Sequence, residues 1–151
     1  MIRHSSSFHV VLAAVLVLAL MPVRGMAQDD SPDVLMLVNT SSNQVQGMAM
    51  SMASHMARQD HAVDIVLCGE AAQLGLQEYI PEALAPRDVS AKEIMQEAMS
   101  FGASVEVCHL YLPNSGYHQY TEEDLLNEVT VNDPEELAQT MARDDVRVIT
   151  Y

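Results

Sequence analysis

Residues 34 to 38 read VLMLV, and this unbroken apolar run decides the fold class. A strand that is buried on both faces has a continuous apolar sequence, because helices cover both sides of a parallel sheet. The run is followed by the polar loop NTSSN at residues 39 to 43, whose residue types favour the start of a helix. The sequence therefore predicts a buried strand that passes into a helix.

The alternation of strand and helix continues to the end of the chain. Further strands are predicted at 62–68, 104–112, 129–131 and 146–150, and helices at 44–59, 69–76, 91–101 and 121–127, with a last one from residue 134. Ser90 and Glu93 have the spacing of a capping box, Gly102 is a typical C-terminal glycine, and Asp133-Pro134 is a strong helix start. The pattern predicts a three-layer α/β/α domain on a mostly parallel sheet of about five strands.

The first predicted helix contains MAMSMASHM at residues 48 to 56. Residues three and four apart share a helix face, so Val45, Met48, Ala49, Met52 and Met56 are predicted to form the buried stripe. Met50 is then expected to point elsewhere. An alternative is a soft-metal site, because thioethers suit Cu(I) and His55 can join them.

The N-terminal segment resembles an export signal. Arg3 precedes an apolar stretch that runs from Phe8 to Met21, and small residues stand at the positions that a signal peptidase reads before Gln28. We therefore expect a signal peptide at 1–27, a flexible tail at 28–33 and one domain at 34–151, in a periplasmic or secreted protein. The apolar stretch is short for a membrane span, and no membrane association is expected after cleavage.

The charge of the chain limits its partners. The formal charge is −14 at pH 7, and loss of Arg3 and Arg24 with the leader makes it two units more negative. Binding to nucleic acid needs clustered Lys and Arg that neutralise phosphates, so no nucleic-acid partner is expected.

Only two cysteines are present, and both fall near the C-terminal ends of predicted strands. Ligands of open α/β sheets bind outside those ends, so Cys68 and Cys108 are expected at the functional edge. Three alternatives stay open: a disulfide, which an oxidising compartment allows, two inert buried thiols, or a reactive Cys108.

A reactive Cys108 must ionise, because the thiolate is the nucleophile. His109 and His118 are the candidates to assist it. Neighbours on a strand point to opposite faces, so His109 can assist only if the strand has already ended there. Thiol exchange needs no cofactor.

The stretch AKEIMQEAMSFGASVEVCHLYLPNSG, together with EEDLLNEVTVNDPEELAQTMARDDVRVITY, resembles the DsrE/TusD family of small sulfur-relay proteins. The shared pattern is a helix that ends in Phe-Gly-Ala, a strand that ends in cysteine, a polar loop, and a helix before a closing strand. The resemblance covers roughly residues 33 to 151.

This resemblance implies a single α/β domain with a five-stranded parallel sheet, and subunits that assemble into trimers or hexamers. It implies that Cys108 carries a persulfide, as a sulfur carrier or in a sulfurtransferase-like reaction, and exchanges sulfur with a donor or acceptor protein. It assigns no settled role to Cys68.

Two other functions remain as alternatives. One is a soft-metal (copper) binding module that uses Cys68, Cys108 and His109 with help from methionines. The other is a non-catalytic oligomeric scaffold in which both cysteines are buried or bridged.

Overall fold

The computed structural model describes residues 32–117 and 119–151. Its centre is a five-stranded sheet in the order β6-β5-β2-β1-β7, and every pair of neighbours is parallel. The strands are β1 (Asp33–Val38), β2 (Val63–Leu67), β5 (Ser104–Val107), β6 (Val129–Val131) and β7 (Val146–Thr150). The prediction of an α/β fold on a parallel sheet of about five strands is confirmed.

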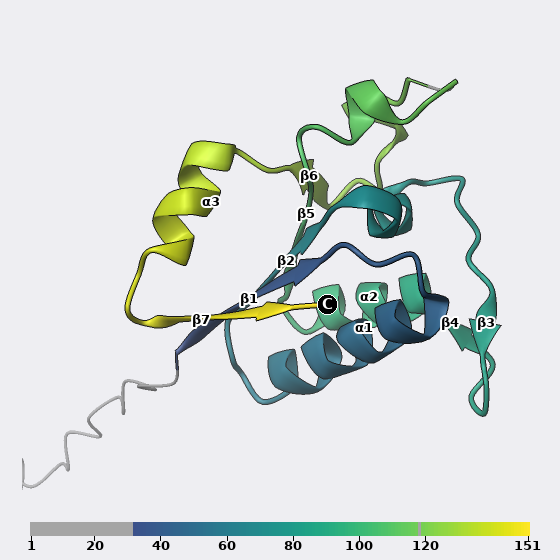
Figure 1. Cartoon of the computed structure of the whole chain (residues 1–151). Helices are drawn as coiled ribbons and strands as arrows, with labels where there is room; N and C mark the ends of the chain where they lie inside the picture. The colour runs from purple at the N-terminus through teal and green to yellow at the C-terminus, as the bar shows by residue number, and fades with distance from the viewer. Residues whose placement is uncertain (1–31, 118) are drawn as a thin grey trace, which may run out of the picture. The chain divides into compact units, whose positions relative to one another are not determined.

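Helices lie on both faces of this sheet (Figure 1). The helices α1 (Asn43–Ala57) and α2 (Ala91–Ser100) run side by side on one face, and α3 (Pro134–Met141) lies on the other. The chain steps from β1 outward to β6 and then crosses back to β7 beyond β1. Since crossovers between parallel strands are right-handed, the return helix α3 must lie on the face opposite to α1 and α2.

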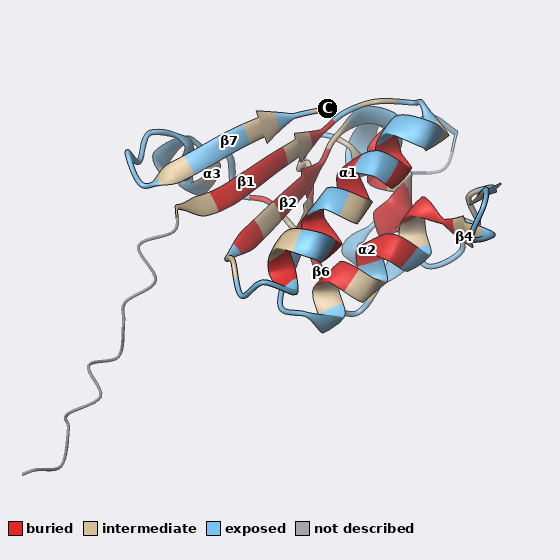
Figure 2. Ribbon diagram, turned by 90° about the horizontal axis from the view of Figure 1, so that it is seen from below, coloured by how far each residue is buried: buried red, intermediate tan, exposed pale blue. Residues whose placement is uncertain are grey.

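The core fills the space between the sheet and the pair α1 and α2 (Figure 2). Alternate residues of each strand point into it, as the two-residue period of a strand requires. The strand residues of this core are Val34, Met36, Val38, Val63, Ile65, Leu67, Val105, Val107 and Val129.

The helix ends follow the predicted capping signals. The Ser90 hydroxyl accepts from the Glu93 amide, and the Glu93 carboxylate accepts from the Ser90 amide at 2.7 Å. The Asp133 carboxylate caps α3 by accepting from the amides of Glu135 and Glu136. Gly102 has a positive φ of 99°, the left-handed conformation that glycine adopts beyond a helix.

The predicted buried stripe of α1 is wrong. Met50 is fully buried, whereas Met48 is 60% exposed, Met52 is 42% exposed and Val45 is 37% exposed. Ala49 of the predicted stripe is buried, and Met56 packs partly against the core. The buried residues of α1 are Gln46, Gly47, Ala49, Met50, Ala53, Ser54 and Ala57.

Residue size explains this register. The buried side of α1 consists mainly of small residues, which allow a helix to lie close to both the sheet and α2. A hydrophobic pattern weights methionine above alanine, so it favoured the wrong side of a helix that is apolar around much of its circumference.

Several shorter elements complete the fold. The segment predicted as a short helix at 69–76 is the 3-10 helix η1 (Gly69–Gly75), and only η3 (Glu122–Asp124) forms in the predicted helix at 121–127. A two-stranded hairpin of β3 (Ala83–Leu84) and β4 (Val89–Ser90), which the sequence did not indicate, precedes α2.

At its N-terminal end, the sheet begins at Asp33, one residue before the expected start of the domain. The Asp33 carboxylate accepts from the Arg143 guanidinium at 2.9 Å, which ties β1 to the segment before β7. The predicted signal peptide, and the tail as far as residue 31, lie outside the described residues. Within the described ranges, no helix has the length and apolar character to cross a membrane.

Candidate functional site

The two cysteines meet at the C-terminal edge of the sheet. Leu67 of β2 is in register with Val107 of β5, and each cysteine is the next residue along its strand. The Cys108 amide donates to the Leu67 carbonyl at 2.8 Å, and the Cys68 amide donates to the Val38 carbonyl at 2.8 Å. The sheet ladder therefore continues one residue beyond each strand and holds the two cysteines side by side.

Both thiols are free, so the predicted alternative of a disulfide is not the state of this structure. The two side chains are close enough to interact, and Cys108 raises the pKa of the Cys68 thiol. Both residues are half-buried rather than enclosed. The chemistry available at this edge is therefore that of an adjacent pair of thiols with access to water.

The two thiols are not equivalent. Burial first, and then the interaction with the Cys108 side chain and its charge, raise the pKa of the Cys68 thiol from 9.0 to about 12. Cys68 therefore keeps its proton at neutral pH and can donate its S–H to the Cys108 sulfur. Of the two sulfurs, that of Cys68 is therefore the weaker nucleophile at neutral pH.

The chain turns immediately after Cys108. The strand predicted to reach Leu112 ends at Val107, and the Tyr111 amide donates to the Cys108 carbonyl at 2.8 Å to close the turn. The side chain of buried Asn132 fixes this turn by accepting from the His109 amide at 2.9 Å. The short 3-10 helix η2 (Leu112–Asn114) follows.

His109 could assist Cys108 only if the strand ended before it, and β5 does end before it, at Val107. Its imidazole Nδ1 is buried and has no hydrogen-bond partner among the described residues. His118, the second predicted assistant, lies outside the described residues.

A pocket of about 270 Å³ opens beside Cys108. It is lined by Gly69, Cys108, Leu110, Tyr111 and Asn114. Cys68 does not line it. A small molecule or a peptide thiol that enters this pocket therefore meets Cys108 and not Cys68.

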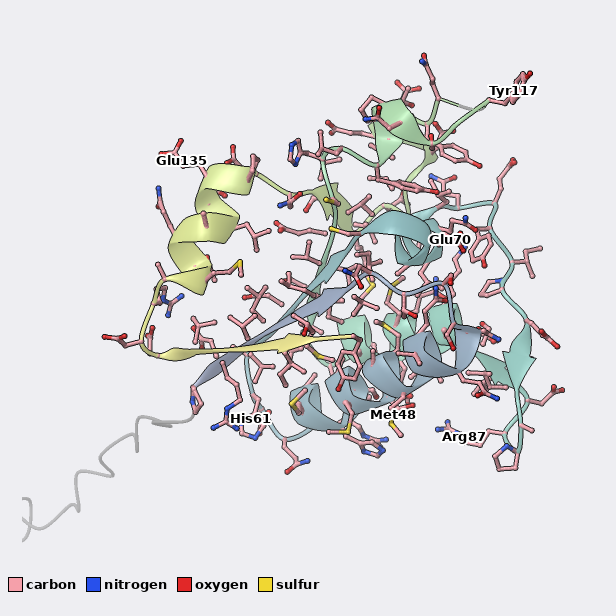
Figure 3. The ribbon with its side chains drawn as sticks, in the orientation of Figure 1. Met48, His61, Glu70, Arg87, Tyr117 and Glu135 are labelled. Carbon is pink, nitrogen blue, oxygen red and sulfur yellow. The ribbon has the colours of Figure 1, made fainter. Side chains whose placement is uncertain are left out.

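Aromatic rings support one side of the pocket. The rings of Tyr111 and Tyr120 stack with centroids 6.4 Å apart and planes at 17°. The pKa of Tyr111 is raised by burial first, and then by Tyr120, Tyr79 and the negative charge of Glu70. Tyr111 therefore remains a neutral phenol beside Cys108. Figure 3 labels Glu70 on η1, the element that follows Cys68.

Gly69 makes the turn from Cys68 into η1. Its φ is 55°, which is the left-handed region that favours glycine. A Cβ at this position would lie 3.5 Å from the Asn39 carbonyl, so space alone does not exclude a side chain. The backbone conformation is what favours glycine at this position, which lines the pocket.

The structure does not assemble the predicted metal ligands around one point. Within residues 32–117 and 119–151, no three side chains of His, Cys, Asp or Glu are grouped as a metal site. The methionines also separate, because Met50 is buried while Met48 projects from α1 on the side away from the sheet (Figure 3).

Sequence reasoning found both cysteines and their shared edge but did not single out Asn132, which holds the turn after Cys108, or Asn114, which lines the pocket. Asn132 directly follows the predicted strand at 129–131, and Asn114 lies two residues after the end of the predicted strand at 104–112. A polar residue at a strand end is the signal that could have indicated them. Comparison with known proteins adds no assignment, since neither the family models nor the curated proteins that were searched match this chain.

Proposed function

We propose that this protein is a thiol-based sulfur carrier of the DsrE-like kind, in which Cys108 holds the sulfur as a persulfide. The observation that carries the proposal is a half-exposed Cys108 thiol at the C-terminal edge of a parallel sheet, in contact with a second thiol and open to a pocket. Catalytic groups of open α/β sheets gather at this edge.

Cys108 would act as the nucleophile. Its thiolate attacks the outer sulfur of a sulfane donor and a new S–S bond forms on Cys108. The donor's S–S bond breaks, and the rest of the donor leaves as a thiolate from a persulfide or as sulfite from thiosulfate. An acceptor thiolate then attacks the outer sulfur in the same way and restores Cys108. The transferred sulfur keeps its oxidation state, so neither step needs a cofactor.

The neighbouring groups have separate roles in this proposal. The S–H of Cys68 donates a hydrogen bond to the Cys108 sulfur and stabilises its negative charge. His109 is positioned in the turn by Asn132 and is the proposed proton acceptor when Cys108 ionises. His118 belongs to the same loop in sequence and is proposed as a second assistant.

We also propose the setting that the sequence indicated. The chain is exported to the periplasm or secreted, it assembles with copies of itself, and it exchanges sulfur with donor or acceptor proteins. The pattern of residues 1–27 supports export. The acidic composition supports the absence of a nucleic-acid partner.

Mass spectrometry of the reduced protein after incubation with thiosulfate or a small persulfide tests the proposal. We expect an adduct of one sulfur atom on the Cys68→Ser variant, where only Cys108 can react. The matched Cys108→Ser variant should carry none. A Cys68→Ser protein that remains unmodified by either donor would contradict the proposed function.

A further inference from the structure

The position of Cys68 gives it a task that the carrier reaction does not require. A single cysteine is sufficient to accept and pass on sulfur, yet the sheet register places a second thiol beside Cys108. Neighbouring strands are about 4.8 Å apart, which falls within the range of about 4.4–6.8 Å between Cα atoms that a disulfide requires. The two strand ends can therefore be bridged with little movement of the backbone.

We infer that Cys68 is a resolving thiol: when Cys108 carries sulfur that no acceptor removes, the Cys68 sulfur attacks Cys108 Sγ, releases sulfide and closes a Cys68–Cys108 disulfide. This inference rests on the proposed function, because it begins with the persulfide. It adds a second outcome for the bound sulfur, namely reduction to sulfide instead of transfer.

The step is balanced without another reactant. The Cys68 Sγ–Cys108 Sγ bond forms as the bond between Cys108 Sγ and the outer sulfur breaks, and the bonding electrons leave with the outer sulfur. The two cysteines are oxidised to a disulfide, and the sulfane sulfur is reduced to sulfide. The proton of Cys68 moves to the outer sulfur, which departs as HS⁻. A dithiol reductant then returns the disulfide to two thiols.

The geometry suits this displacement. The attacking and leaving sulfurs must lie on opposite sides of Cys108 Sγ. Cys108 lines the pocket and Cys68, on the neighbouring strand, does not, so the inference places the outer sulfur in the pocket and the attack by Cys68 outside it. A donor in the pocket also reaches Cys108 before Cys68, which fixes the order of the two reactions.

The environment of Cys68 makes the step slower than transfer to a good acceptor. Burial holds the proton on Cys68, and a thiol is a poor nucleophile until it loses that proton. The same retained proton is the one that the departing sulfur needs. The site thus keeps a persulfide long enough for an acceptor thiol to enter the pocket, and converts it to sulfide when none does.

A single-turnover experiment on the full, reduced chain tests the inference. One equivalent of a small persulfide is added without an acceptor thiol, and released sulfide and protein mass are followed together. We expect the unsubstituted protein to release up to one sulfide per chain and to become two hydrogens lighter, with a peptide that links Cys68 to Cys108. Cys68→Ser and Cys68→Ala should both keep the added sulfur and release no sulfide.

The outcomes separate this inference from the proposed function. If neither the unsubstituted protein nor the two Cys68 variants acquire sulfur, and the unsubstituted protein releases no sulfide and forms no disulfide, the proposed function itself fails. If they acquire sulfur and the unsubstituted protein keeps it equally long, with no sulfide and no disulfide, Cys68 is not a resolving thiol while Cys108 remains a carrier. The use of both serine and alanine ensures that a folding defect in one variant does not decide the result.

Discussion

The buried side of α1 gives the sharpest test of how this chain packs, because two methionines two residues apart have opposite environments. Met50 is fully buried and Met48 is 60% exposed. Substitution of each by alanine removes the same atoms and changes the intrinsic helix propensity equally. The difference between the two variants therefore measures burial alone.

The size of each change in the free energy of unfolding follows from the burial of the two side chains. Truncation of a buried methionine to alanine costs about 2–5 kcal/mol, which combines the lost transfer free energy with the cavity left behind. An exposed position far from special features changes the free energy of unfolding by no more than about 0.5 kcal/mol. We expect Met50→Ala to lower the free energy of unfolding by about 3 kcal/mol and Met48→Ala to leave it nearly unchanged.

Urea denaturation followed by circular dichroism measures both effects. With an m-value of about 1.5 kcal/mol/M, the loss in Met50→Ala corresponds to a midpoint lower by roughly 2 M, while m itself stays the same. If Met48→Ala proves as destabilising as Met50→Ala, or more so, α1 presents the face that the hydrophobic pattern predicted and the reasoning from small residues is refuted.

Three further predictions concern the site and its supports. Iodoacetamide at neutral pH should label Cys108 well before Cys68, because the Cys68 thiol has a pKa of about 12 and stays protonated. Peptide mapping of early time points measures the two labelling rates, and equal rates would contradict the prediction. Glu106→Gln should stabilise the protein at pH 7, since burial and then the charges of Asp64 and Glu136 raise the pKa of Glu106. A carboxyl whose pKa is raised on folding destabilises the native state once it is ionised. The gain in the free energy of unfolding should therefore disappear when urea titrations are run at a pH below the pKa of this carboxyl in the unfolded chain. The exposed control Glu78→Gln should show no such gain at pH 7. Lys92→Met should lower the free energy of unfolding by roughly 1.5–3 kcal/mol, measured by thermal or urea denaturation. The reason is that the Lys92 ammonium donates to the carbonyls of Leu76, Gln77 and Tyr79 at 2.6, 2.9 and 2.9 Å. A variant as stable as the unsubstituted protein would show that water replaces these bonds.

Parts of the site were accessible from sequence because they depend on topology. Parallel strands end at a common edge, so residues that follow two apolar runs must come near each other when those strands are neighbours. The end of β5 at Val107 was not accessible in this way. The residues from His109 to Leu112 are compatible with a strand by type, and the turn that replaces it depends on the Asn132 side chain, which is 23 residues away in sequence.

The sequence by itself determined the class of the fold, since its alternating apolar runs and capping signals depend on local backbone preferences that hold in any context. It also indicated that the two cysteines lie at the C-terminal edge of the sheet. Only the tertiary structure decided which side of α1 is buried, because that choice depends on how closely a helix of small residues can approach the sheet and α2. Only the register of β2 against β5 decided that Cys68 and Cys108 are in contact, because hydrogen bonds between distant segments set that register and no local pattern encodes them.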